Sequence, residues 1–134
     1  MENLYNELLQ EAKDVSNNSY SPYSKFSVGA CVLFESGKKY TGANIENASY
    51  GLTICAERIA IANAISQGED TKIKAIAIYS PNQKRCYPCG ACRQWLSEFA
   101  VSEQDTKIIL EDANSLPLVL TLGEIFPYNF KIDD

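Results

Sequence analysis

The sequence predicts an α/β fold in which helices are layered on a mixed β-sheet. Segments with helical periodicity alternate with strand-like segments, in the order helix, hairpin, helix, strand, helix and two more strands. The 134 residues are enough for one domain with a sizeable core, which we expect to span residues 1–134. Apolar residues make up 46% of the chain and charged residues 22%, as is typical of soluble globular proteins.

The first half of the chain opens with an amphipathic helix over residues 2–16, where apolar side chains recur at helical spacing. Polar, turn-forming residues end this helix. Residues 26–34 alternate in the manner of a strand whose two faces are both partly apolar. Ser36-Gly37 is a hairpin signal, so we expect residues 39–43 to return as the second strand.

The second half is expected to hold two further helices and three strands. Small and apolar residues over 54–66 suit a buried helix, which Gly68 ends. Another helix is predicted at about 89–99, with Pro88 at its start. The strands are predicted at 72–79, 107–111 and 116–121, followed by an apolar, proline-containing tail at 123–130.

Charge and composition narrow the choice of partners. The net charge is −5, and the 12 lysines and arginines are scattered, whereas binding to phosphate backbones requires clusters of them. We therefore expect a small neutral ligand rather than nucleic acid. No apolar stretch approaches the length of a membrane span, and Met1-Glu2-Asn3 does not open a secretory leader, so we expect no membrane partner and a cytoplasmic location.

Cysteine is the residue that carries the chemistry, because the chain has five cysteines and no histidine. Cys89 and Cys92 are three apart at a predicted helix start, so both sulfurs lean to one face, and Cys55 would supply a third thiolate. Three thiolates leave the fourth tetrahedral position for water, as in catalytic zinc sites. Spacing alone also permits Cys86 in place of Cys55, or a closed four-cysteine structural site.

Charged residues next to these cysteines are candidates for proton transfer and for offsetting the negative charge of the thiolates. Glu57 follows Cys55 by two positions, and a desolvated carboxylate there could shuttle protons. Three thiolates give zinc a formal charge of −1, so positive potential is expected near the sulfurs, from helix N-termini and from Arg58 or Arg93. Cys31 lies on an alternating strand and is predicted to be a core residue.

Two other pairs of residues are candidates for binding. Asn44 and Glu46 point the same way in an extended segment, and an amide beside a carboxylate can hydrogen-bond a diol or a single hydroxyl. Turn capping is the alternative role for Asn44. Tyr128 and Phe130 form an aromatic tail of the kind that marks an interface.

Cys55-Ala56-Glu57, followed by Pro88-Cys89-Gly90-Ala91-Cys92, resembles the zinc-dependent nucleobase deaminases, and the all-cysteine form resembles the small cytidine deaminases. That resemblance implies a three-layer α/β/α sandwich with a mixed five-stranded sheet. It also implies zinc-dependent deamination of cytidine and deoxycytidine in pyrimidine salvage. The other segments that look like this family, in its order, are Pro22–Phe26, Val28–Ala30, Gly42–Ala48 and Cys89–Gln94.

The resemblance also implies roles at the metal centre. It makes Glu57 the proton shuttle and Arg58 the partner of the thiolates. The three ligands of the single zinc in each subunit are then Cys55, Cys89 and Cys92.

For the substrate, the resemblance implies that Phe26 stacks on the pyrimidine and that the backbone of Ala56 contacts the base. Asn44 and Glu46 would hold the ribose 3′-hydroxyl. The family resembled is homotetrameric, so Phe130 is expected to reach a neighbour's active site.

Two other functions remain to be weighed against this one. An aminonucleoside-antibiotic deaminase shares the zinc motifs, but the segment Asn44–Ala48 speaks against it. An inactive, zinc-stabilised binding protein is opposed by the intact Glu57. Tyr87 and Phe126 depart from the family pattern, and they bear on fine specificity and packing.

Overall fold

The computed structural model describes residues 2–132 and contains a five-stranded mixed sheet with the strand order β2-β1-β3-β4-β5. Neighbouring strands are antiparallel except for the parallel pair β3 and β4. The predicted fold class is confirmed. The strands are β1 (Gly29–Phe34), β2 (Lys39–Ala43), β3 (Ile73–Tyr79), β4 (Lys107–Glu111) and β5 (Pro117–Thr121).

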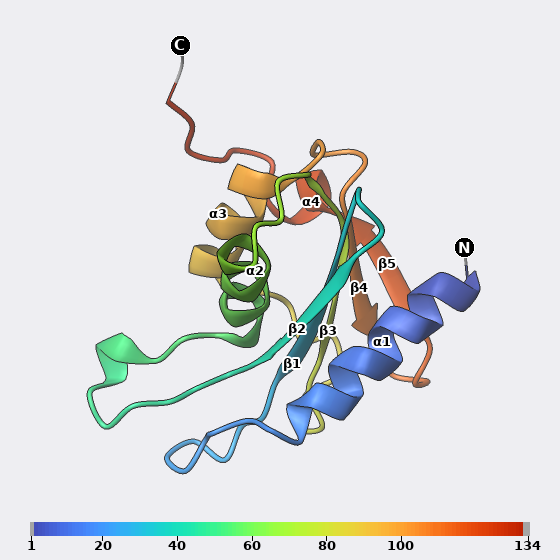
Figure 1. The fold of residues 1–134 in the computed structure, drawn as a ribbon. Helices are drawn as coiled ribbons and strands as arrows, with labels where there is room; N and C mark the ends of the chain where they lie inside the picture. The colour runs from blue at the N-terminus through green and yellow to red at the C-terminus, as the bar shows by residue number, and fades with distance from the viewer. Residues whose placement is uncertain (1, 133–134) are drawn as a thin grey trace.

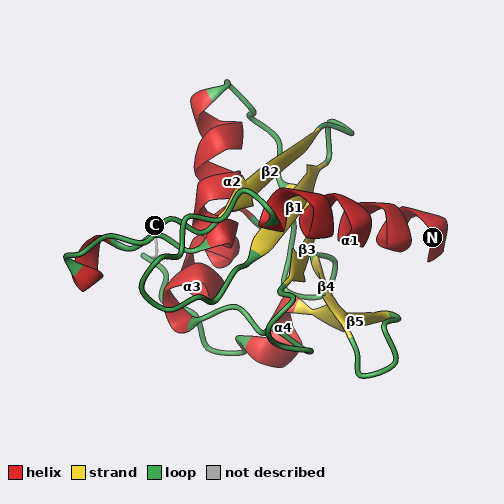
Figure 2. Ribbon diagram, turned by 90° about the horizontal axis from the view of Figure 1, so that it is seen from below, coloured by secondary structure: helices red, strands yellow, loops and turns green. Residues whose placement is uncertain are grey.

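Helices cover both faces of this sheet. One face carries α1 (Glu2–Ser16), and the opposite face carries α2 (Ala56–Ser66) and α3 (Gly90–Phe99), as Figure 1 shows and Figure 2 shows from below. A short helix, α4 (Leu122–Ile125), packs beside α3, and a 3₁₀ turn, η1 (Tyr50–Leu52), lies in the long loop before α2. This arrangement is the expected three-layer sandwich.

The core explains why strand residues are apolar on both faces. Along β1, Ala30, Val32 and Phe34 pack on the side of α2, while Cys31 and Leu33 pack on the side of α1. Cys31 has no exposed surface, and burial raises the pKa of its thiol to about 12. It is therefore a core residue, remote from any exposed chemistry.

The start of the first strand and the C-terminal tail differ from the prediction. The first strand begins at Gly29 rather than at residue 26, because the Asn44 side chain bonds the backbone there: Phe26 O accepts from Nδ2 and Val28 N donates to Oδ1. The apolar, proline-containing tail predicted at 123–130 overlaps α4, a helix that was not predicted. Thr121 and Glu124 form a reciprocal capping box at its start, a Thr-x-x-Glu signal that the sequence displays.

Close approach at Gly42 fixes the position of α2 over the sheet. A Cβ at Gly42 would lie 2.4 Å from Ala60 N and 2.8 Å from Ala56 O, so only glycine lets the helix lie this near to β2. Because Ala56 directly follows Cys55, this contact also places the start of α2, where the site is built.

A buried carboxylate joins two turns at the far end of the sheet. Glu69 accepts hydrogen bonds from Thr71 Oγ1 at 2.6 Å, Ser36 Oγ at 2.8 Å and Tyr40 OH at 3.0 Å. These bonds, that from Thr71 first, lower the pKa of Glu69 from 4.5 to about 2. Because the folded pKa is depressed, the stabilisation is present above the unfolded pKa and is lost as the pH falls toward about 2.

We expect Glu69→Gln to remove this pH dependence. The variant should be less stable than the wild type at pH 7, and the difference in denaturant midpoint should shrink as the pH falls from about 4.5 toward about 2. Urea unfolding of both proteins across this range measures the difference directly. A gap between the two midpoints that stays constant with pH would contradict the assignment.

Candidate active site

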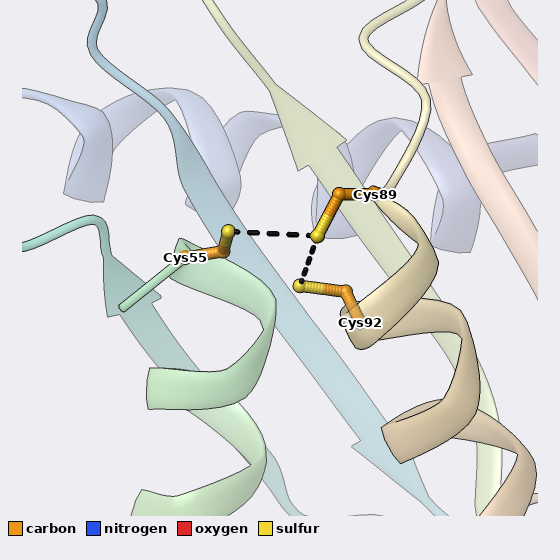
Figure 3. Close-up of side chains that lie close together, drawn as sticks. All are labelled: Cys55, Cys89 and Cys92. Atoms are coloured by element: carbon orange, nitrogen blue, oxygen red, sulfur yellow. Dashed lines mark hydrogen bonds between the residues drawn. The ribbon is translucent and has the colours of Figure 1, made fainter. Parts of the chain in front are cut away.

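Three cysteines meet where two helices begin. Cys55 is the N-cap residue of α2, Cys89 is the N-cap residue of α3, and Cys92 lies in the first turn of α3. Neither N-cap sulfur caps its own helix, so both sulfurs are free to point at one another (Figure 3). The unpaired backbone N–H groups of both helix starts supply positive potential, which favours thiolates.

The separations of the sulfurs fit zinc. Cys55 Sγ lies 3.8 Å from Cys89 Sγ, which lies 3.5 Å from Cys92 Sγ, and all three lie within 4.8 Å of one another. Sulfurs bound to one tetrahedral zinc at about 2.3 Å are about 3.8 Å apart. Among residues 2–132 this is the one such group of potential ligands, and Cys86 is not part of it.

Charge around the sulfurs favours metal binding. Hydrogen bonds from Cys92 and Arg58 lower the pKa of the Cys55 thiol to about 5, and the pKa of Cys92 rises because its S–H bonds the Cys55 sulfur. Arg58 Nη2 lies 3.5 Å from Cys55 Sγ. Arg93, the other cationic candidate, instead donates to the carbonyl oxygens of Pro88 at 2.7 Å and Ile125 at 2.6 Å. Arg58 is thus the arginine that faces the thiolates.

Glu57 lies beside this group and is only 4% exposed. Its burial raises the pKa of its carboxyl to about 7. A carboxyl that titrates near neutral pH can both accept and donate a proton under working conditions. This carboxyl also lines a cavity that opens from the thiols, so it is placed for proton transfer to a bound molecule.

The cavity has a volume of about 340 Å³, within the range of small-molecule sites. It brings together most of the side chains that the sequence singled out. The predicted residues that line it are Phe26, Asn44, Glu46, Cys55, Ala56, Glu57 and Cys89. Its wall also contains Ser24, Val28, Thr53, Cys86 and Tyr87. Ser24 and Val28 lie in segments that resemble the family, but the sequence alone assigns no role to either.

Hydrogen bonds leave few polar groups of Asn44 and Glu46 unused. Asn44 Oδ1 accepts from Ser19 Oγ and from Val28 N, and Nδ2 donates to a carbonyl oxygen. Glu46 accepts three hydrogen bonds from Tyr23 and Ser24. Within the described residues, one N–H donor of Asn44 and one acceptor position of Glu46 remain free. One donor and one acceptor suit a single hydroxyl.

Phe130 is the one predicted substrate-binding residue that does not line this cavity. Its ring is 72% exposed, and its backbone is held on α3 by Gln94, which donates to Phe130 O at 3.0 Å and accepts from Phe130 N at 3.2 Å. The tail leaves the body beside α3 (Figure 1). Within one chain, Phe130 does not contribute to the cavity.

Three clustered thiols, a buried carboxyl with a pKa near neutrality and an adjoining ligand cavity define a zinc-dependent hydrolase. The sequence model described as the cytidine and deoxycytidylate deaminase zinc-binding region matches residues 2–106. The chain belongs to this family, and zinc is its cofactor, one ion per chain.

Named relatives match nearly the whole chain. It is 42% identical over 127 residues to a cytidine deaminase from Halalkalibacterium halodurans, covering 95% of this chain and 94% of that protein. It is 38% identical over 130 residues to a cytidine deaminase from Mycobacterium tuberculosis, covering 97% and 92%. The crystal structure of cytidine deaminase from Burkholderia pseudomallei matches with a TM-score of 0.85 at 36% identity, covering 93% of this chain and 98% of that one.

No helix within residues 2–132 is both long enough and apolar enough to span a membrane.

Proposed function

We propose that the protein catalyses hydrolytic deamination of cytidine and deoxycytidine to uridine and deoxyuridine, with release of ammonia, as a step of cytoplasmic pyrimidine salvage. The observation that carries the proposal is the single cavity in which the thiol group, Glu57 and the pair Asn44 and Glu46 meet. Membership of the deaminase family and the named relatives support the same reaction.

The metal would be held by Cys55, Cys89 and Cys92. When bound, zinc supplies Lewis acidity that lowers the pKa of a water molecule from 15.7 toward about 7. Arg58 offsets part of the negative charge of the thiolates through its contact with Cys55, and the N-termini of α2 and α3 offset more. Without this compensation, the negative charge of three thiolates would reduce the Lewis acidity of the metal and raise the pKa of its water molecule.

Glu57 would carry the protons of the reaction. Its carboxylate accepts a proton from the attacking water and passes a proton to ring N3 of the base, and later delivers a proton to the departing ammonia. These transfers require a group that is close to half-protonated at neutral pH, and burial brings the pKa of Glu57 to about 7. The carbon atom attacked gains one oxygen and loses the amine, so the atoms balance with one water consumed.

The other lining residues would bind the nucleoside. Phe26 would stack on the pyrimidine, and the backbone of Ala56, which lies between Cys55 and Glu57 in the chain, would contact the base. Asn44 and Glu46 would share the ribose 3′-hydroxyl, because together they offer one donor and one acceptor. One donor and one acceptor are enough for the 3′-hydroxyl alone, and neither is left for the 2′-hydroxyl. Cytidine and deoxycytidine should therefore both be substrates.

Incubation of the purified protein with cytidine, deoxycytidine and cytosine, followed by ultraviolet absorbance, tests the proposed function. We expect conversion of both nucleosides and little conversion of cytosine, which lacks the hydroxyl that Asn44 and Glu46 bind. No conversion of any of the three by zinc-loaded protein would overturn the proposal and favour an inactive binding protein.

We further propose a homotetramer in which Phe130 completes the active site of a neighbour. Exposed apolar side chains in two regions support an interface: Tyr50 and Leu52 in the loop that projects beyond the body, and Tyr128 and Phe130 in the tail, where Tyr128 is 93% exposed (Figure 1). Two hydrogen bonds between the Gln94 side chain and the backbone of Phe130 fix this backbone on α3 and leave the ring exposed.

Deletion of residues 128–134 should weaken substrate binding and loosen the assembly together. Loss of one aromatic stacking contact predicts a rise in KM of roughly three- to tenfold. Deletion of residues 131–134, which keeps Phe130, is the matched control and should leave KM unchanged. Sedimentation and steady-state kinetics measure both properties, and an unchanged KM after the longer deletion would show that the tail has no part in a neighbour's site.

A further inference from the structure

Ser24 links two of the side chains that face the substrate cavity. Its hydroxyl donates to Glu46 Oε2 and accepts a hydrogen bond from Phe26 N at 2.9 Å. The backbone N–H groups of Tyr23 and Ser24 donate to Glu46 Oε1 at 3.0 and 3.1 Å. One short loop therefore supplies three donors to a single carboxylate that lines the cavity.

The backbone of this loop is built to present that hydroxyl. Lys25 has φ +60°, in the left-handed region that residues other than glycine rarely adopt. Such a conformation persists where surrounding contacts fix it. Here Lys25 N donates to Ser21 O at 3.0 Å, and Ser27 N donates to Asn82 Oδ1 at 2.9 Å. The turn at Lys25 lets the Ser24 hydroxyl reach Phe26 N and Glu46 at once.

The Ser24 bond determines how much of the Glu46 carboxylate is left for a ligand. A carboxylate has about four acceptor positions. The loop occupies both positions on Oε1, and Ser24 occupies one of the two on Oε2. The remaining position is fixed in direction, because Oε2 cannot turn without breaking the Ser24 bond. The same bond is the largest cause that lowers the pKa of Glu46, which favours the carboxylate form as the acceptor.

We propose that Ser24 is a positioning residue that orients the Glu46 carboxylate toward one hydroxyl group of the nucleoside. This inference rests on the proposed function, in which Glu46 binds the 3′-hydroxyl. The specificity for a sugar-bearing substrate then depends on a side chain that itself makes no bond to the sugar. Loss of the Ser24 hydroxyl frees the carboxylate to turn and to take up water, so the bond to the substrate weakens.

Kinetics on cytidine and 3′-deoxycytidine separate this role from a general structural one. We expect Ser24→Ala to raise KM for cytidine about tenfold and to change kcat less than about twofold, because the Ser24 hydroxyl bonds Glu46 and Phe26 N and not Glu57 or the three cysteines. KM for 3′-deoxycytidine should rise less than about threefold, because that substrate has no hydroxyl for Glu46. Ser24→Thr keeps the hydroxyl and should restore the wild-type KM.

Two controls complete the experiment. Ser21→Ala removes a hydroxyl from the same loop that contacts Ser19 and Ser27 but not Glu46, and should leave KM for cytidine unchanged. In a Glu46→Gln background, Ser24→Ala should have no further effect on KM for cytidine. An equal rise in KM for both substrates, or no rise for cytidine in an active enzyme, would overturn the role of Ser24. Inactivity of the wild type toward cytidine would instead overturn the proposed function.

Discussion

Cys55→Ala is expected to lose both zinc and activity. The remaining sulfurs of Cys89 and Cys92 both belong to α3, so nothing from α2 would complete the centre. Loss of a direct ligand should lower zinc affinity by more than the ~10–100-fold that is typical of losing an outer partner. Elemental analysis of freshly purified protein should give close to one zinc per chain for the wild type and close to none for the variant.

Cys86→Ser is the matched control for this loss. Cys86 lines the same cavity but stands outside the three-sulfur group, and burial raises the pKa of its thiol to about 12, so it is a poor source of thiolate. Its replacement should leave zinc at one per chain. Full zinc in Cys55→Ala, together with zinc loss in Cys86→Ser, would show that the alternative allowed by the sequence spacing is the true ligand set.

Glu57→Gln is expected to lower kcat by at least roughly 10²–10⁴-fold while zinc stays bound. The amide keeps the size of the carboxyl but cannot accept and return protons. The side chain is buried, so bulk water does not take its place. The other carboxylate that lines the cavity, Glu46, is held by three hydrogen bonds from Tyr23 and Ser24. Turnover of cytidine and zinc content are measured on the same preparation, so loss of metal cannot be mistaken for loss of proton transfer.

Glu98→Gln makes the same chemical change on the exposed face of α3 and should retain full activity. If Glu57→Gln turned over cytidine at a near-normal rate with zinc bound, Glu57 would have no part in proton transfer. The raised pKa of Glu57 would then be a consequence of its burial that has no role in catalysis.

The metal cluster is the part of the site that the sequence predicts best, because its geometry is local. Cys89 and Cys92 are three residues apart at the start of α3, so their sulfurs lie on the same face of that helix. Only the identity of the third ligand depends on how distant parts of the chain pack together. The sequence allowed Cys55 or Cys86, and the packing of α2 against β2 at Gly42 brings Cys55 to within 3.8 Å of Cys89.

Residues whose role depends on a partner far along the chain were less predictable. The strand that was expected to begin at Phe26 begins later because Asn44, distant in sequence, binds the backbone beside Phe26. The role inferred for Ser24 depends in the same way on Glu46, 22 residues away. Strand periodicity and turn propensity depend only on residues that are close in the sequence. They therefore cannot predict that the side chain of a distant residue, such as Asn44, will bond the backbone where a neighbouring strand would otherwise pair.

X-ray absorption at the zinc edge of the purified wild-type protein tests the three-thiol centre most directly. We expect three sulfur neighbours at about 2.3 Å and one lighter neighbour, the pattern of a site that keeps one position open beside Glu57. Four sulfur neighbours would mean that Cys86 joins Cys55, Cys89 and Cys92 in a closed structural site, and would contradict the account of a hydrolytic centre.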